Sequence, residues 1–155
     1  MTLATLLVVG CLLAVVAAVV VSRQRFRATD ATNARAGMLA AAEWLEDETQ
    51  CKLRAELWDM HKLGTNVPSN IAYVATADEV GRVCQTIGYY VKRNVVPGDV
   101  VIENWGREMV STWDACKPWA DFRRAEEDPT VWADFEWLAN ESLTKYPRPA
   151  GEADA

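Results

Sequence analysis

The 155-residue chain has almost no histidine and lacks the short motifs that mark the common classes of enzyme. His61 is the only histidine, so one chain cannot supply two histidine ligands, and no serine or cysteine neighbour indicates a catalytic triad. A glycine-rich phosphate loop, G-x-S-x-G and H-E-x-x-H are all missing. The sequence therefore predicts a protein that is not an enzyme and needs no cofactor, with His61 on the surface or at a helix flank.

Closely paired cysteines are also missing. In the order Cys51, His61, Cys84 and Cys116, the intervals are 9, 22 and 31 residues, without the C-x-x-C knuckle of zinc sites. A metal site built from these four residues is therefore disfavoured. Cys84 and Cys116 fall on apolar faces of predicted helices, which indicates reduced, core-filling cysteines. A disulfide is disfavoured in the reducing compartment that the topology below predicts.

Charge is absent from residues 3–21, an unbroken run of 19 residues. A helix of this length is about 28 Å long, close to a hydrocarbon core of about 30 Å. The alternative is a cleaved signal peptide, which has a positive start, a shorter apolar stretch and a small-residue cleavage site. Here no lysine or arginine precedes the run, and the run ends in three valines. The sequence predicts a transmembrane anchor over residues 1–22.

Positive charge follows the predicted span directly. Arg23, Arg25 and Arg27 lie within the basic juxtamembrane segment 23–29. Positively charged flanks remain in the cytoplasm, so we expect the N-terminus outside and the rest of the chain at the inner face of the cell membrane. The three arginines are also candidate contacts for anionic lipid headgroups, although a topology signal alone accounts for them.

One face of the predicted span carries small residues. Gly10, Ala14 and Ala18 recur at every fourth position. This spacing lets two membrane helices approach closely, although alanine is common in membrane helices for other reasons. These residues are therefore candidates for a helix–helix contact and for a homo-oligomer formed through the span.

The remainder of the chain is acidic. Residues 46–155 carry 12 lysines and arginines against 20 acidic residues, a net charge of −8, whereas residues 1–45 carry +2. An acidic domain repels phosphate backbones, so nucleic acid is not an expected partner. Residues 146–155 contain proline, glycine and acidic residues and indicate a disordered tail, which leaves residues 30–145 as one helical cytoplasmic domain.

Apolar residues recur at helical spacing in five segments of this domain, and the sequence predicts an all-α fold of four or five packed helices after the membrane helix. The clearest face is expected at the centre of the core. No run of six or more residues alternates like an exposed strand, and residues 71–74 are the only short strand candidate. The predicted faces are Ala34, Met38, Ala41, Ala42 and Leu45; Leu53, Leu57 and Met60; Val80, Val83, Cys84, Ile87 and Val91 (the clearest); Ile102, Trp105, Met109, Trp113, Cys116 and Ala120; and Trp132, Phe135, Leu138, Ala139 and Leu143.

Capping residues and prolines predict where these helices begin and end. The first pattern shifts at residues 46–48. Residues 65–75 are expected to form a surface loop, followed by a capping box at Thr76–Glu79 that starts the central helix. Pro118 must kink or end the next helix near Lys117. Asp128-Pro129 is expected to begin the last helix.

Seven tryptophans are many for a domain of this size. Each buries about 150–250 Å² when it is covered, so we expect some of them to be half exposed. Exposed tryptophans either mark a docking surface or simply flank helices, and the sequence does not separate these alternatives.

One carboxylate is expected to be partly covered by aromatic residues. Glu136 lies between Trp132 and Trp137 on the predicted last helix. A covered carboxylate needs a cation, and Arg123 and Arg124 precede the same helix. We predict a structural ion pair between Glu136 and one of them. Loss of one partner from a buried pair costs about 3–5 kcal/mol.

Several of these positions carry a family resemblance. They are Val83-Cys84-x-x-Ile87-Gly88-Tyr89-Tyr90-Val91, Val96-Pro97, Trp105-Gly106, Trp113, Pro118, Arg123, Trp132 and Phe135-Glu136-x-Leu138-Ala139. Together they resemble an uncharacterised bacterial family, known only as a domain of unknown function, across most of residues 1–143. The resemblance implies short single-pass membrane proteins with a compact helical cytoplasmic domain. It implies no activity, ligand or catalytic residue.

The anchor, the excess of tryptophan and the missing catalytic motifs favour an interaction module. We expect a membrane-tethered scaffold or accessory subunit whose partners are the lipid bilayer and an unidentified protein. Two alternatives remain: a phage-encoded or host-modulating small membrane protein, and an enzyme acting on a lipid or lipid-linked substrate. The last alternative requires Glu136, His61 and an arginine to face one pocket.

Overall fold

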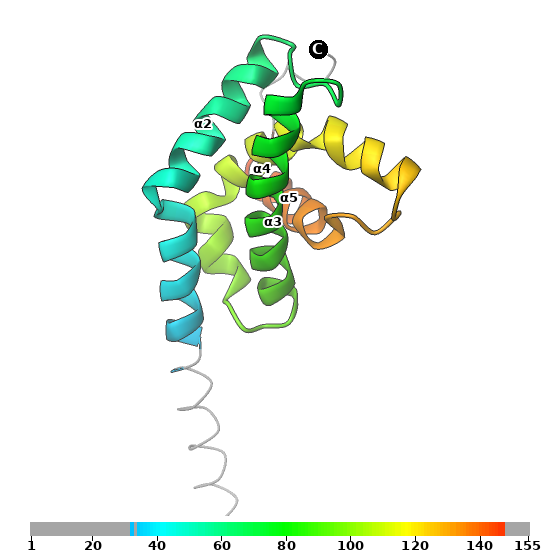
Figure 1. Ribbon diagram of the computed structural model, residues 1–155. Coiled ribbons are helices and arrows are strands. Elements are labelled where there is room, and N and C mark those ends of the chain that lie inside the picture. The colour runs from blue at the N-terminus through cyan, green and yellow to red at the C-terminus, as the bar shows by residue number, and fades with distance from the viewer. Residues whose placement is uncertain (1–31, 33, 148–155) are drawn as a thin grey trace, which may run out of the picture. The chain divides into compact units, whose positions relative to one another are not determined.

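The structure is a computed structural model that describes residue 32 and residues 34–147. The chain divides into two units, Met1–Ala36 and Gly37–Ala155, and the four labelled helices belong to the second unit (Figure 1). Within the described residues the regular structure consists of five helices and no strand, which confirms the all-α prediction. Among these residues, no helix has the length and apolarity needed to cross a bilayer. The predicted span at residues 3–21 lies outside them.

The first two helices meet at a break fixed by side chains. Residues 34–46 are helical and bury Ala41 and Leu45. Asp47 then caps α2 (Glu48–Lys62), because its carboxylate accepts a hydrogen bond from the Gln50 backbone N–H at 3.0 Å. From α2 the buried Arg54 donates to the Leu45 carbonyl oxygen at the end of the preceding helix. The predicted shift at residues 46–48 is confirmed.

The central helix begins earlier than its sequence predicts. α3 spans Ile71–Lys92, and Asn70 caps it by accepting hydrogen bonds from the Ala72 and Tyr73 backbone N–H groups. The predicted loop is confirmed for residues 65–70 and wrong for residues 71–75, and the capping box at Thr76–Glu79 and the strand candidate at 71–74 are wrong. The physical reason is that Asn70 caps as well as threonine does, and the extra turn places the Tyr73 ring in the core with no exposed surface.

α3 forms the centre of the core, as predicted. Val80, Cys84, Ile87 and Val91 are all buried along it. α3 packs against α2, α4 and α5, which surround it in Figure 1. A helix of 22 residues is about 33 Å long, so the two ends of α3 lie far apart.

α4 (Gly98–Glu126) continues through Pro118 instead of ending there. Figure 1 shows its yellow C-terminal part running in a different direction from its yellow-green N-terminal part. Proline removes a backbone donor and crowds the preceding turn, so the ladder is disturbed here. The Tyr73 hydroxyl of α3 fills the gap. It accepts from the Trp119 backbone N–H at 3.1 Å and lies 3.0 Å from the Ala115 carbonyl oxygen, to which it donates.

The last helix, α5 (Ala133–Lys145), starts later than Asp128-Pro129 predicts. The Asp128 carboxylate instead accepts from the backbone N–H and the hydroxyl of Thr130, both at 2.8 Å, and so forms a local turn. These bonds lower the pKa of Asp128. The N-terminus of α5 is capped from α3, because Gln85 Oε1 accepts from the Asp134 and Phe135 backbone N–H groups at 3.0 Å.

The C-terminal boundary of the domain also shifts. The tail is predicted over residues 146–155, of which residues 148–155 lie outside the described part of the chain. The Tyr146 hydroxyl donates to the Glu103 carbonyl oxygen at 3.2 Å, and its ring packs on Gly106 of α4. Tyr146 therefore belongs to the packed domain.

Two glycines let α5 and the turn before it approach α3. A Cβ atom on Gly88 would lie 2.3 Å from the Asp134 carbonyl oxygen. A Cβ atom on Gly81 would lie 2.3 to 2.6 Å from three atoms of the Trp132 indole ring. No larger residue fits at either position without movement of its neighbours, so these glycines set the α3–α5 distance.

Candidate functional site

A groove of about 480 Å³ runs beside α3. It lies where the C-terminal part of α4 and the turn before α5 meet α3. Four of its lining residues are charged, two of each sign. The lining residues are Ala75, Asp78, Glu79, Arg82, Gln85, Thr86, Arg123 and Trp132.

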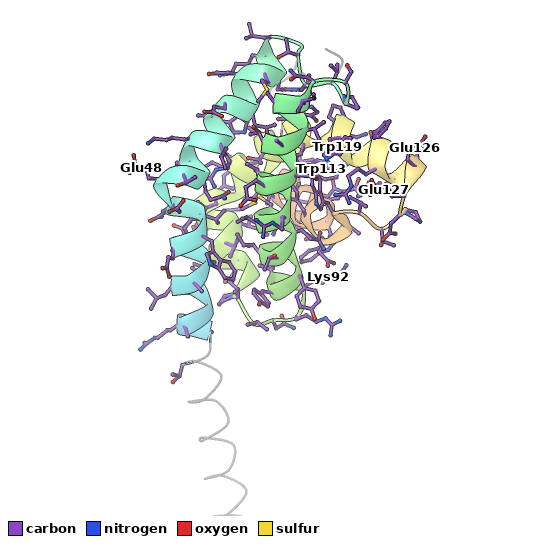
Figure 2. The ribbon with its side chains drawn as sticks, viewed as in Figure 1. Glu48, Lys92, Trp113, Trp119, Glu126 and Glu127 are labelled. Atoms are coloured by element: carbon purple, nitrogen blue, oxygen red, sulfur yellow. The ribbon has the colours of Figure 1, made fainter. Side chains whose placement is uncertain are left out.

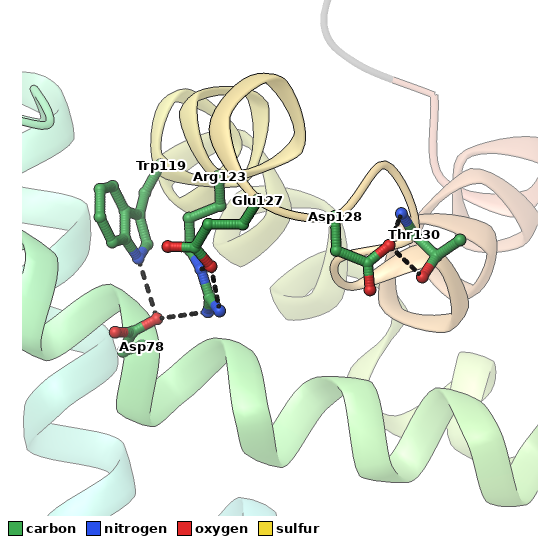
Figure 3. Close-up of polar contacts among 6 residues, drawn as sticks. All are labelled: Asp78, Trp119, Arg123, Glu127, Asp128 and Thr130. Atoms are coloured by element: carbon green, nitrogen blue, oxygen red, sulfur yellow. Dashed lines mark hydrogen bonds and ion pairs between the residues drawn. The ribbon is translucent and has the colours of Figure 1, made fainter.

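The Asp78 carboxylate joins α3 to the end of α4 (Figure 3). Its Oδ1 atom accepts from Trp119 Nε1 at 2.9 Å and from Arg123 Nη1 at 3.1 Å. Arg123 also donates from Nε and Nη2 to Glu127 Oε2, at 3.0 and 2.9 Å. The hydrogen bonds that Arg123 donates to Glu127, reinforced by the charge of Asp78, raise the pKa of Arg123. The guanidinium is thus shared between two carboxylates and holds the end of α4 against α3.

The other polar groups of the groove also have partners within the domain. Arg82 Nη2 pairs with Glu79 Oε2 at 2.5 Å, and the Thr86 hydroxyl donates to the Arg82 carbonyl oxygen. Gln85 is occupied with the N-terminus of α5. With its charges balanced and paired, the groove serves to fasten α4 and α5 to α3. Neither His61 nor Glu136 lines it.

Trp132 has the left-handed backbone conformation, with φ of 53°, which is uncommon for a bulky residue. Backbone strain of this kind often marks a functional site. Here packing accounts for it, because the buried indole ring covers Gly81 and fixes the turn into α5.

The structure brings Glu136 together with Arg124. Arg124 Nη1 lies 3.0 Å from Glu136 Oε2, and Arg124 Nε donates to the Val131 carbonyl oxygen at 2.8 Å. Arg123 pairs with Asp78 and Glu127 instead. The Glu136 side chain keeps 34% of its surface exposed, so the cost predicted for a fully buried pair is too high. A solvated pair of this kind contributes about 1 kcal/mol or less.

The cysteines and the histidine do not converge. Burial raises the pKa of the Cys84 thiol from 9.0 to about 12 and also raises the pKa of Cys116. Cys51 is exposed, and all three thiols are free. His61 Nδ1 lies 2.9 Å from Asn66 Nδ2 on the surface. Over the described part of the chain, no three side chains of the metal-binding types lie close enough to hold an ion.

The remaining predicted site residues lie outside the part of the chain that the structure describes. They are the candidate lipid contacts and the candidate helix–helix residues, namely Arg23, Arg25, Arg27, Gly10, Ala14 and Ala18.

Most of the exposed large apolar residues lie near the two ends of α3, apart from Leu39 and Phe122. Most tryptophans are buried or half-buried, and Trp44 is the most exposed of them at 37%. Leu63 is 77% exposed and Ile71 is 85% exposed, and both belong to the α2–α3 loop, defined here as residues 63–71. At the opposite end of α3, Trp44, Tyr89 and Val95 are exposed.

The α2–α3 loop is held in shape by its own polar groups. Asn70 Nδ2 donates to the Thr65 carbonyl oxygen at 3.1 Å, and the Asn70 backbone N–H donates to the Val67 carbonyl oxygen at 2.9 Å. Gly64, with φ of 66°, makes the turn after α2. The loop contains no charged residue. It therefore presents Leu63, Val67 and Ile71 on an ordered, uncharged surface.

Comparison with protein families matches residues 4–142 to one family model. The chain belongs to the family described as Domain of unknown function (DUF4760). This confirms the resemblance to an uncharacterised family that the sequence motifs indicate. No curated protein and no solved structure matches the chain.

The residues that the sequence analysis missed share one signal. Gly81, Gln85 and Gly88 are spaced four and three positions apart, so they lie on one face of the strongest amphipathic helix. Glycine weakens a helix by about 1 kcal/mol relative to alanine, so two glycines on one face indicate close approach of another backbone.

Proposed function

We propose that this DUF4760 chain is a non-enzymatic interaction module tethered to the inner face of the cell membrane. The observation that carries the proposal is the uncharged run of residues 3–21, followed closely by Arg23, Arg25 and Arg27. Hydrocarbon thickness matches the run, and the arginine flank favours the cytoplasmic side for everything that follows.

The partner surface that we propose is the α2–α3 loop. Its exposed Leu63 and Ile71 have no covering element in the domain, and its backbone is ordered by Asn70. Exposed large apolar residues on an ordered surface are typical of protein–protein contacts. A tether raises the effective concentration of such a surface toward other membrane-bound proteins, so a weak contact suffices.

Membrane extraction followed by purification tests this proposal. The full chain, expressed at its natural level, is extracted in mild detergent and compared with a Leu63→Ser/Ile71→Ser variant. Phe122→Ser serves as the matched control, because Phe122 is an exposed apolar residue on α4. We expect one protein to co-purify with the wild type and with the control and to be lost from the double variant. A chain that sediments as a monomer without any partner, or that leaves the membrane at high pH, contradicts the proposal.

A further inference from the structure

We propose that one end of the domain rests on the headgroup region of the bilayer. This end, called the aromatic end, consists of Trp44, Tyr89, Tyr90, Arg93 and Val95. The inference rests on the proposed membrane tether and adds to it the part of the domain that faces lipid.

The three aromatic rings of the aromatic end contact one another and are partly exposed. Trp44 and Tyr90 stack with their ring centroids 6.0 Å apart, and Tyr89 and Tyr90 are 5.8 Å apart. The Arg93 guanidinium lies 5.0 Å from the centroid of the Tyr89 ring. Trp44 is 37% exposed and Tyr89 is 43% exposed. Tryptophan and tyrosine concentrate at membrane–water interfaces because each has an apolar body and a polar edge.

The chain enters the domain beside this end. Gly37 is the first residue of the second unit. It packs against the turn after α3, because a Cβ atom on Gly37 would lie 2.7 Å from the Val95 carbonyl oxygen. The N-terminal attachment point and the aromatic end are therefore at the same end of α3. Figure 2 labels Lys92 at this end, opposite the α2–α3 loop.

Lipid contact through the aromatic end needs the least extension of the link that precedes the domain. The link between the predicted span and Gly37 consists of residues 22–36. Fifteen residues reach at most about 50 Å when fully extended, whatever their conformation. The far end of α3 lies about 33 Å beyond the aromatic end, so contact with lipid is easiest at the aromatic end.

Charge also separates the aromatic end from the rest of the domain. Residues 37–155 carry 12 lysines and arginines against 21 acidic residues, a net charge of −9, so an anionic membrane repels most of this surface. Residues 89–98 contain Lys92 and Arg93 and no acidic residue. Lys92 pairs with Asp134 at 2.9 Å, whereas Arg93 has no carboxylate partner among the described residues. Arg93 is thus the cation available to a lipid phosphate.

Photo-crosslinking in vesicles tests the inference with the full chain. p-Benzoylphenylalanine replaces one residue at a time: Tyr89→p-benzoylphenylalanine at the aromatic end, Ile71→p-benzoylphenylalanine at the opposite end, and Leu13→p-benzoylphenylalanine in the predicted span. The proteins are reconstituted in vesicles of phosphatidylcholine with phosphatidylglycerol, irradiated and analysed by mass spectrometry for lipid adducts. We expect roughly tenfold more adduct at position 89 than at position 71. This ratio corresponds to a preference of about 1.4 kcal/mol for the orientation in which the aromatic end faces lipid.

The three positions separate the inference from the tether on which it rests. Absence of adduct at position 13 contradicts the tether itself. Adduct at position 13 with equal or greater adduct at position 71 than at position 89 overturns the inference alone. A position-89 crosslink to a second copy of the chain, or to another protein, also overturns it. An Arg93→Gln change, which removes one positive charge, should lower the position-89 adduct about fivefold in the same vesicles, because each basic residue near the surface contributes about 1 kcal/mol.

Discussion

The face of α3 that α5 covers and the two ends of α3 use their residues in different ways. On the covered face, Gly81 and Gly88 admit another chain segment, and Gln85 caps α5. At the ends, Ile71 and Tyr89 extend into solvent. The comparison shows that Gly81, Gln85 and Gly88 on the covered face assemble the domain, whereas the exposed residues at the two ends of α3 take no part in that packing. Changes of buried residues should therefore cost stability, and changes of exposed residues at the two ends of α3 should not.

The largest expected loss comes from Gly88→Val. The new side chain would overlap the Asp134 carbonyl group and force α5 away from α3. Overpacking of this kind costs about 3 kcal/mol. Urea denaturation followed by circular dichroism measures the change. The matched control is Ala72→Val at an exposed position of the same helix, where a loss below about 0.7 kcal/mol is expected. Equal midpoints for the two variants would show that α5 does not pack as described.

Tyr73 and Tyr89 offer the next test, because both belong to α3 but Tyr73 is buried and Tyr89 is exposed. Tyr73→Phe removes the hydrogen bonds that the buried hydroxyl makes with the Trp119 N–H and the Ala115 carbonyl oxygen beside Pro118, at a cost of about 2 kcal/mol. Tyr89→Phe removes a hydroxyl from an exposed ring and should leave the unfolding free energy unchanged. Thermal and urea unfolding of both variants, side by side, measure the difference. A Tyr73→Phe variant as stable as the wild type would contradict the bridging role of that hydroxyl.

Alkaline pH should lower the free energy of unfolding of the domain as the pH rises from about 9 toward 12. Burial favours the neutral Cys84 thiol and raises its pKa from 9.0 to about 12, whereas the unfolded chain ionises near 9.0. Its contribution to stability is fully present below about pH 9 and declines as the pH rises toward 12. Unfolding at a series of pH values from 8 to 11 follows the decline. The slope should be smaller in a Cys84→Ala variant than in the wild type.

The smallest expected effect concerns the pair between α4 and α5. Glu136→Ala should lower the unfolding free energy by about 1 kcal/mol or less, because the carboxylate that pairs with Arg124 is partly solvated. Urea denaturation at low and high salt measures the loss, which should shrink as salt is added. A loss of several kcal/mol that is insensitive to salt would indicate a buried pair instead.

Local patterns in the sequence predict the helix faces well and the helix ends poorly. The spacing of Val80, Cys84, Ile87 and Val91 identifies the central helix, because burial acts on every turn of it. The start of α5 depends on Gln85, which lies 49 and 50 residues away from the N–H groups that it caps. The passage of α4 through Pro118 likewise depends on a hydroxyl 46 residues distant from Trp119. Such partners are set by tertiary packing, so local sequence rules do not reveal them.

The polar contacts of the groove are also only partly predictable from the local sequence. The sequence places Arg124 and Glu136 close enough to suggest an ion pair, because a short turn separates α4 from α5. Asp78 and Arg123 are 45 residues apart and come together only when α3 and α4 pack. The sequence therefore suggests one polar contact of this region and misses the one that lines the groove.

The central claim is that the N-terminal segment holds the domain at the cytoplasmic face of a membrane. Protease treatment of right-side-out and inverted membrane vesicles, with an epitope tag fused after Ala155, tests it most directly. The account predicts that the tag is lost only from inverted vesicles and that the chain stays in the membrane fraction. Loss of the tag from right-side-out vesicles, or recovery of the whole chain in the soluble fraction, would contradict it.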